Sequence, residues 1–194
     1  MKMGTGVGYV STDKRKVIIV TDGDRNAKKA VETAARNVGA RCISCSAGNP
    51  TRQTGEELVE LIRTAPADPV VLMLDDRGYC GMGNGERALA YIARHPDIQV
   101  LGVLAVASNI TGGGGCTVDL SVAGNGEIVK EPVNKVGKPG GNLLRGDTVE
   151  IVDQLGIPLV IGIGDIGKMN GADDVKKGAP LTTKALQNIL SRNL

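Results

Sequence analysis

The feature that most constrains the fold of this 194-residue chain is a series of short apolar runs, most of them unbroken by polar residues. Continuous runs of Val, Ile, Leu and Ala are typical of strands buried on both faces of a parallel sheet. A strand with one solvated face would instead alternate apolar and polar residues. The expected strands are Val17–Thr21, Arg41–Ser46, Val70–Leu74, Val100–Ala107 and Pro158–Ile163.

Stretches with helical periodicity separate these runs. Apolar residues recur on one face of Arg25–Val38, which predicts a helix that ends at Gly39. Thr54-Gly55-Glu56-Glu57 has the pattern of a capping box and opens a second helix that ends before Pro66. Further helices are expected over Gly85–Arg94, from Asp147 to Gly156, and over Thr182–Ser191.

The alternation of strands and helices predicts an α/β fold. We expect one doubly wound parallel sheet of about five strands, Rossmann- or flavodoxin-like, with helices on both faces. Residues 109–146 break the rhythm with "TGGGG", "AGNGE" and "GKPGG", which are loop signals. Within them, Thr117–Val122 and Glu127–Val129 are expected to pair as a hairpin. The predicted organisation is a flexible arm over 1–15 and one α/β domain over 16–194, with a flap inserted at 109–146.

Composition argues against several classes of protein. The net charge of +2 is small for a dedicated nucleic-acid binder, and a chain with 3 Tyr and no Phe or Trp offers few rings for stacking bases. No apolar run approaches the ~20 residues that cross a bilayer, and the N-terminus lacks the apolar segment of a signal peptide. We therefore expect an intracellular protein with no transmembrane segment and no nucleic-acid partner. A homo-oligomer is compatible with the sequence.

The cysteines do not form a recognisable zinc motif. Cys42 and Cys45 have C-x-x-C spacing, but no second pair of this kind follows. Since they fall in a predicted strand, an odd separation would point the two thiols to opposite faces. Buried structural thiols are the expectation.

Acidic residues follow several of the predicted strands. Because the carboxyl ends of parallel strands meet at one edge of a sheet, these residues should share one rim, where ligands bind in such folds. Carboxylates crowded together need a divalent cation, a neighbouring Lys or Arg, or raised pKa values. The sequence therefore predicts a site for Mg²⁺ or Ca²⁺ at Asp22, Asp24, Asp75 and Asp165, with ligand contacts from Ser46, Asp76, Ser108 and Lys168.

A structural interpretation of individual aspartates stays open. Asp is a favoured N-cap residue, and both Asp24 and Asp147 precede predicted helices. In that position a carboxylate accepts hydrogen bonds from free N–H groups and interacts favourably with the helix dipole. Either residue could cap a helix instead of contacting a ligand.

A catalytic interpretation also stays open. In a haloacid-dehalogenase-like phosphoryl transfer, Asp22 would be the nucleophile and Asp24 the general acid, while Asp165 with Asp173 or Asp174 would hold Mg²⁺. However, the residues after Asp24 lack the Thr-Leu/Val continuation of that family. A Toprim-like arrangement fits less well, because its D-x-D should follow the third strand and not the first.

Four stretches carry a resemblance to a known family: "VIIVTDGDRNAKKAVE", "GARCIS.S.GNPT..TGEELVELI", "HPDIQVLGVLAVASN" and "GDTVEIVDQLGIPLVIGIGDIGKMNGADDVKKGAPLTTKAL". They resemble the soluble stage V sporulation protein AE family, over roughly residues 16–192. The resemblance implies an accessory protein of the spore, peripheral to its inner membrane, that acts in germination or dipicolinic acid movement. It also implies, as partners, the inner-membrane proteins of the same sporulation operon. Since it supplies no catalytic residues, we expect binding of an ion or small ligand and no catalysis.

Overall fold

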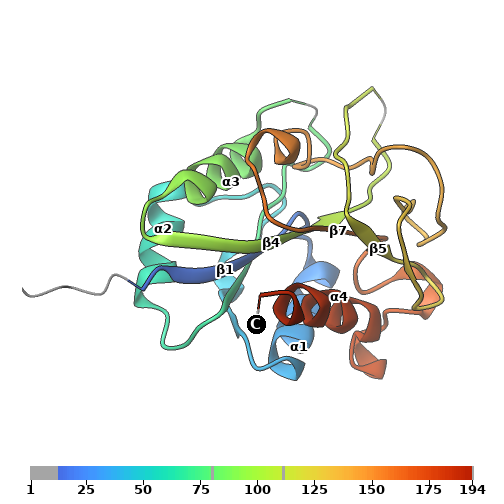
Figure 1. The fold of residues 1–194 in the computed structure, drawn as a ribbon, viewed down its shortest axis with the longest axis horizontal. Coiled ribbons are helices and arrows are strands. Elements are labelled where there is room, and N and C mark those ends of the chain that lie inside the picture. The colour runs from blue at the N-terminus through green and yellow to red at the C-terminus, as the bar shows by residue number, and fades with distance from the viewer. Residues whose placement is uncertain (1–12, 80, 111, 194) are drawn as a thin grey trace, which may run out of the picture.

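A computed structural model of the protein describes residues 13–79, 81–110 and 112–193. Within these residues, seven strands form one sheet in the order β2-β3-β1-β4-β7-β5-β6 (Figure 1). All neighbouring strands are parallel except β5 and β6. The predicted mixed α/β fold with a mostly parallel sheet is therefore confirmed. Most of the predicted N-terminal arm, residues 1–12, lies outside the described residues.

The bounds of most elements agree with the sequence pattern to within a few residues. The strands are β1 (Arg15–Val20), β2 (Arg41–Cys42), β3 (Val70–Met73), β4 (Ile98–Val106), β5 (Leu120–Val122), β6 (Ile128–Val129) and β7 (Val160–Ile163). The α-helices are α1 (Arg25–Asn37), α2 (Gly55–Thr64), α3 (Asn84–Arg94) and α4 (Pro180–Ser191). Single 3₁₀ turns are η1 (Ser44–Ser46), η2 (Val152–Gln154), η3 (Met169–Gly171) and η4 (Val175–Lys177).

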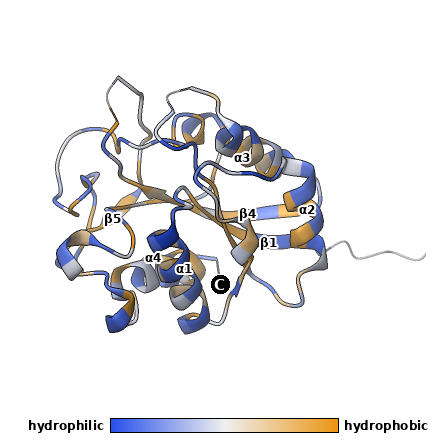
Figure 2. Cartoon of the chain, turned by 180° about the vertical axis from the view of Figure 1, so that it is seen from behind, coloured by the Kyte–Doolittle hydropathy of each residue, from blue (hydrophilic) through white to orange (hydrophobic). Residues whose placement is uncertain are grey.

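Helices cover both faces of the sheet. In Figure 1, α3 lies above the strands, and α1 and α4 lie below them. α2 contributes to the same apolar core as α3, so these two helices cover one face. Each pair packs against one of two separate apolar cores, and the strands supply alternate residues to both. Figure 2 shows the resulting hydrophobic colour along the strands, between helices of mixed hydropathy. No helix in the described part of the chain is long and apolar enough to cross a membrane.

The order of the strands differs from the two layouts named as expectations. In both the Rossmann and the flavodoxin orders, the second strand lies next to the first. Here β1 lies between β3 and β4, and β2 is at the edge of the sheet, paired only with β3 among the described strands. The strand count also exceeds the predicted five, because β5 joins the sheet through β7.

The predicted hairpin is confirmed and extends the sheet. β5 and β6 pair antiparallel around the turn at Asn125-Gly126, with Ser121 opposite Val129. The N–H of Gly126 donates to the carbonyl of Ala123 across this turn. The inserted segment therefore forms one edge of the sheet.

Two predicted elements are wrong, one in its second half and the other as a whole. The second strand stops at Cys42, and the chain then turns through η1 because the Ser46 hydroxyl bonds the carbonyl of Ile43. As a consequence Cys45 is exposed, whereas only Cys116 among the described cysteines is buried. The helix predicted from Asp147 does not form either. Thr148 has a left-handed backbone with φ of 61°, which is incompatible with a helix, and only the short η2 follows.

Candidate functional site

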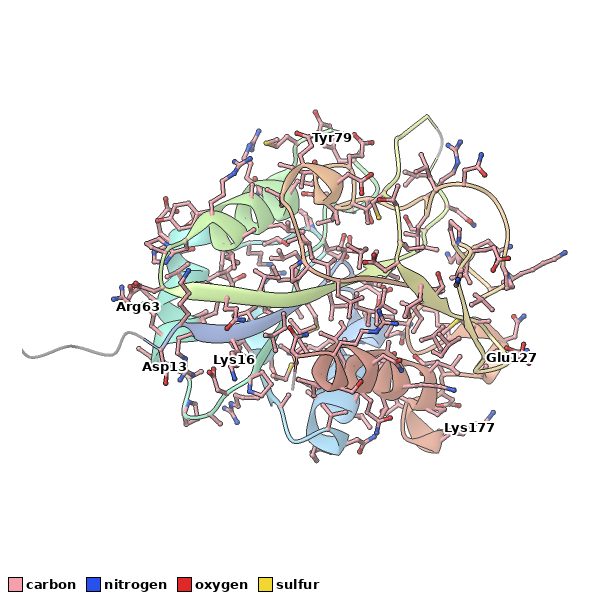
Figure 3. The ribbon with its side chains drawn as sticks, viewed as in Figure 1. Asp13, Lys16, Arg63, Tyr79, Glu127 and Lys177 are labelled. Atoms are coloured by element: carbon pink, nitrogen blue, oxygen red, sulfur yellow. The ribbon has the colours of Figure 1, made fainter. Side chains whose placement is uncertain are left out.

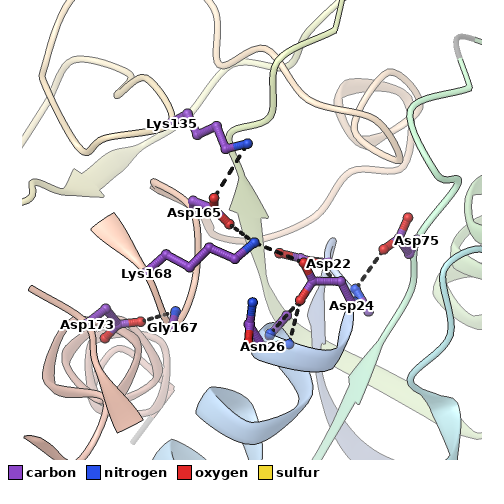
Figure 4. A network of polar contacts seen from close by, with 11 residues as sticks. Asp22, Asp24, Asn26, Asp75, Lys135, Asp165, Gly167, Lys168 and Asp173 are labelled. Atoms are coloured by element: carbon purple, nitrogen blue, oxygen red, sulfur yellow. Dashed lines mark hydrogen bonds and ion pairs between the residues drawn. The ribbon is translucent and has the colours of Figure 1, made fainter. Parts of the chain in front are cut away.

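The loops that follow β1, β3, β4 and β7 meet at the carboxyl edge of the sheet. The chain leaves β1 for α1 on one face and leaves the adjacent β3 for α3 on the other. Such a reversal between two neighbouring strand ends marks the usual position of the ligand site in parallel sheets. We refer to Asp22, Asp24, Asp75, Asp165 and Lys168 as the acidic rim (Figure 4).

Lys168 joins two of the rim carboxylates. Its Nζ lies 3.1 Å from Asp24 Oδ2 and 3.1 Å from Asp165 Oδ1. A second lysine, Lys135, reaches the other oxygen of Asp165 at 3.5 Å. Burial opposes protonation of Lys168, but its bonds with Asp24 and Asp165 outweigh this and raise its pKa above the usual value. These four side chains form a continuous line of alternating charge.

Asp24 also caps α1. Its Oδ1 accepts hydrogen bonds from the N–H groups of Asn26 at 2.7 Å and Ala27 at 2.8 Å. Burial would raise the pKa of Asp24, but the Ala27 N–H and the Lys168 ammonium prevail and lower it. The capping interpretation of Asp24 is confirmed, and its carboxylate stays charged.

The pKa of Asp22 shifts in the opposite direction to that of Asp24, although only Gly23 separates the two residues. Its Oδ1 accepts a hydrogen bond from the Asp24 N–H at 3.1 Å, and no ammonium or guanidinium pairs with it in the described residues. Burial, followed by the negative charge of Asp24, raises the pKa of Asp22 to about 8. Asp22 is therefore largely protonated at neutral pH and is a potential hydrogen-bond donor.

Asp75 follows β3 and lies beside Gly23 at the same edge of the sheet. It is 3% exposed, and its carboxylate accepts from the N–H groups of Gly23 at 3.1 Å and Arg77 at 2.6 Å. Burial, with the nearby charge of Asp147 also contributing, raises the pKa of Asp75 to about 6. The guanidinium of Arg77 forms no ion pair within the described chain, so Asp75 is stabilised only by backbone groups.

Two of the predicted ligand contacts are used inside the fold. Ser46 is fully buried, and its hydroxyl donates to the carbonyl of Ile43 and accepts from the N–H of Met73. Asp76 is 4% exposed and accepts from the N–H groups of Gly85 and Glu86, so it stabilises the start of α3. The expectation that Ser46 and Asp76 bind a ligand therefore gains no support from their contacts.

Ser108, the third predicted contact, lines a cavity of about 380 Å³ beside the rim. Its hydroxyl accepts from the N–H of Asp147 at 3.2 Å. The cavity has two cationic side chains, Lys135 and Arg145, which sequence analysis did not identify because both lie in the inserted segment. The cavity is also lined by the polar side chains of Asn109 and Asn134 and by the apolar side chains of Ile110, Val133 and Leu143.

Asp173, considered above as a magnesium ligand, is fully buried. Its two oxygens accept from the N–H groups of Gly167, Leu181 and Thr182 and from the Thr182 hydroxyl. Its oxygens are therefore occupied in holding the start of α4.

The described residues contain no group of three or more Asp, Glu, His or Cys side chains arranged to hold a metal ion. The aspartates of the rim lie near one another, but their oxygens are directed to backbone N–H groups and lysines. A divalent cation at this rim stays a prediction. Such an ion would need ligands in addition to those the protein now presents.

Gly23 allows the close approach that builds the rim. A Cβ at this position would lie 2.5 Å from the carbonyl oxygen of Gly48 and 3.2 Å from Cβ of Asp75. We expect Gly23→Ala to lower the free energy of unfolding by about 2 kcal/mol, because a backbone neighbour cannot move aside easily. Urea denaturation measures this loss.

Gly114→Ala is the matched control. Its Cβ would meet only the flexible side chain of Glu150, at 3.2 Å or more. We expect a change of less than about 0.5 kcal/mol there. Equal stabilities for the two variants would contradict the role assigned to Gly23.

Comparison with known proteins gives one family. The family model described as stage V sporulation protein AE1 matches residues 16–193, which is nearly the whole chain. No curated protein and no solved structure matches it.

Proposed function

This chain belongs to the stage V sporulation protein AE1 family and is therefore a sporulation-related protein. We propose that its acidic rim and the adjoining basic cavity together bind a small chelate, a divalent cation held by a carboxylate ligand. The calcium complex of dipicolinic acid is the example we favour. The protein would then serve dipicolinic acid movement as a binding component at the spore inner membrane.

The observation that carries this proposal is the position of Lys135. Its side chain lines the cavity, and its Nζ is 3.5 Å from Asp165 in the acidic rim. A ligand placed at this junction would have carboxylates on one side and ammonium and guanidinium groups on the other. A chelate carries both complementary charges, whereas a free cation or a free anion carries only one.

The charges of the acidic rim favour a cation at the part of the ligand that contacts the rim. Of the four acidic side chains of the rim, Asp24 and Asp165 pair with lysines, whereas Asp22 and Asp75 pair with no lysine or arginine of the described residues. The pKa values of Asp22 and Asp75 are raised by burial and by neighbouring acids, and a divalent cation would relieve that repulsion. Because the described residues offer no complete set of metal ligands, an ion that arrives with ligands of its own is favoured.

The side chains that line the cavity favour a planar dicarboxylate at the part of the ligand that lies away from the rim. Lys135 and Arg145 can each pair with a carboxylate, and Ile110, Val133 and Leu143 provide apolar walls for a ring. Its volume of about 380 Å³ is at the lower end of small-molecule sites.

Phosphoryl transfer is less well supported by the same contacts. The pKa of Asp24 is lowered, which is unfavourable for a general acid, and Asp173 is occupied in holding α4. Hydrolysis of a generic phosphoester by the protein, lost in Asp22→Asn, would nevertheless favour the enzyme over the binding protein.

Calorimetric titration tests the proposal. We expect heat from equimolar calcium and dipicolinate, at least about tenfold weaker binding in Lys135→Met, and little change in Lys29→Met, an exposed lysine on α1. The tenfold loss follows because one charge-assisted contact is worth more than about 1.4 kcal/mol. The absence of heat with calcium, dipicolinate and their mixture would overturn the proposal.

A further inference from the structure

The outward side of α3 forms a surface that has no part in the rim. Met82, Arg87, Tyr91, Arg94 and His95 line a hollow of about 520 Å³ there, and we call these five residues the α3 surface. The opposite side of the helix already fills the core with Ala88, Leu89 and Ile92. The fold therefore does not require the apolar and cationic groups that α3 presents outward.

The α3 surface exposes large apolar side chains. Met82 is 50% exposed and Tyr91 40% exposed. Tyr79, in the loop before α3, is 63% exposed and lies at the edge of the molecule in Figure 3. Tyr and Met are enriched in the contact surfaces of protein complexes. Their gathering at one helix indicates a surface that another molecule covers.

Tyr91 is held in place before any partner binds. Its ring lies over Gly55 of α2, where a Cβ would come within 2.7 Å of the ring atom Cδ1. On the other side it contacts His95, with ring centroids 5.9 Å apart. A tyrosine fixed in this way loses little conformational entropy on binding, which suits an anchor residue of an interface.

The charge of the α3 surface is positive. Arg87 and Arg94 are exposed and lie two helical turns apart, about 10 Å along the axis. Neither guanidinium forms an ion pair with any described carboxylate. Glu86, next to Arg87, points inward and accepts from the N–H of Ile151 instead. Two uncompensated arginines thus flank an aromatic and apolar centre.

We propose that the α3 surface docks an acidic, amphipathic segment of a different protein. Two carboxylates about 10 Å apart would pair with Arg87 and Arg94, and an apolar side chain between them would enter the hollow beside Tyr91. An anionic membrane fits less well, since lipid recognition uses clusters of about four to eight basic residues. A second copy also fits less well, because a two-fold contact would bring this positive surface against itself.

Selection of binders from a phage-displayed library of random peptides tests the proposal on the full chain. We expect the recovered peptides to be enriched in Asp and Glu together with Leu, Ile or Phe. Recovery should fall at least about tenfold on the variant Arg87→Glu with Arg94→Glu, and also on Met82→Ser. The matched control reverses the charges of two residues on α1, with Lys29→Glu and Arg36→Glu. Both side chains are exposed and likewise two turns apart, and this variant should leave recovery unchanged.

Several results would overturn the proposal. Peptides without acidic enrichment, or equal recovery on the Arg87 and Arg94 variant, would exclude an acidic segment at this surface. Flotation of the protein with phosphatidylglycerol vesicles at physiological salt, lost in the same variant, would assign the surface to lipid. Sedimentation as a dimer that Arg94→Glu dissociates would assign it to a second copy.

Discussion

Asp173→Ala is expected to lower the free energy of unfolding by about 3 to 5 kcal/mol, which would be a large part of the stability of a protein of this size. The carboxylate is fully buried and accepts four hydrogen bonds, from three backbone N–H groups and the Thr182 hydroxyl. Hydrogen bonds to a charged acceptor are worth about 1.5 to 3 kcal/mol each, and their removal leaves buried donors without partners. Urea denaturation of the two proteins measures the difference.

Asp174→Ala provides the comparison from the adjacent position. The Asp174 side chain accepts one hydrogen bond, from the N–H of Lys176, beside a short 3₁₀ turn that is not buried. We expect a loss of at most about 1 kcal/mol. Asp173→Asn should fall between the two alanine variants, because an amide keeps the shape but offers only one accepting atom. If Asp173→Ala were as stable as Asp174→Ala, the buried carboxylate would not be what holds α4.

Elements that depend on local pattern were predictable from the sequence. The strand before Asp22 and the helix after Asp24 follow from apolar continuity and helical periodicity, and the Thr54 capping box is present with both its bonds. The failures occur where distant contacts decide the backbone. Thr148 adopts a left-handed conformation, and Glu86 from α3 accepts from Ile151, so residues that favour a helix locally do not form one.

The position of the rim could be predicted, but the charge states and hydrogen-bond partners of its individual side chains could not. Parallel strands bring Asp22 and Asp75 to one edge whatever the loops do. Which carboxylate is charged depends on partners far away in the chain, such as Lys168 for Asp24. Lys135 reaches Asp165 from the part of the inserted segment that follows the hairpin, where the residue pattern indicates only turns and loops.

Asp22→Asn is expected to remove the loss of stability that ionisation of Asp22 causes as pH rises. The pKa of Asp22 is raised from 3.8 to about 8 in the folded protein, so between these values the folded state binds a proton that the unfolded state has lost. The free energy of unfolding must therefore fall as pH rises from about 4 to about 8. Each pKa unit is worth about 1.4 kcal/mol, and we expect the neutral amide to gain at least about 2 kcal/mol over wild type at pH 9 and little at pH 4.

Asp24→Asn should show the opposite sign. The pKa of Asp24 is lowered, so its contribution to stability is present above its unfolded pKa near 3.8 and is lost as pH falls through the folded value. The variant should be less stable than wild type at pH 7 and approach it at low pH. Urea denaturation of all three proteins in chelator between pH 4 and pH 9 gives the curves. If the Asp22→Asn curve ran parallel to that of wild type, Asp22 would ionise normally, and burial and the neighbouring acids would not hinder its ionisation.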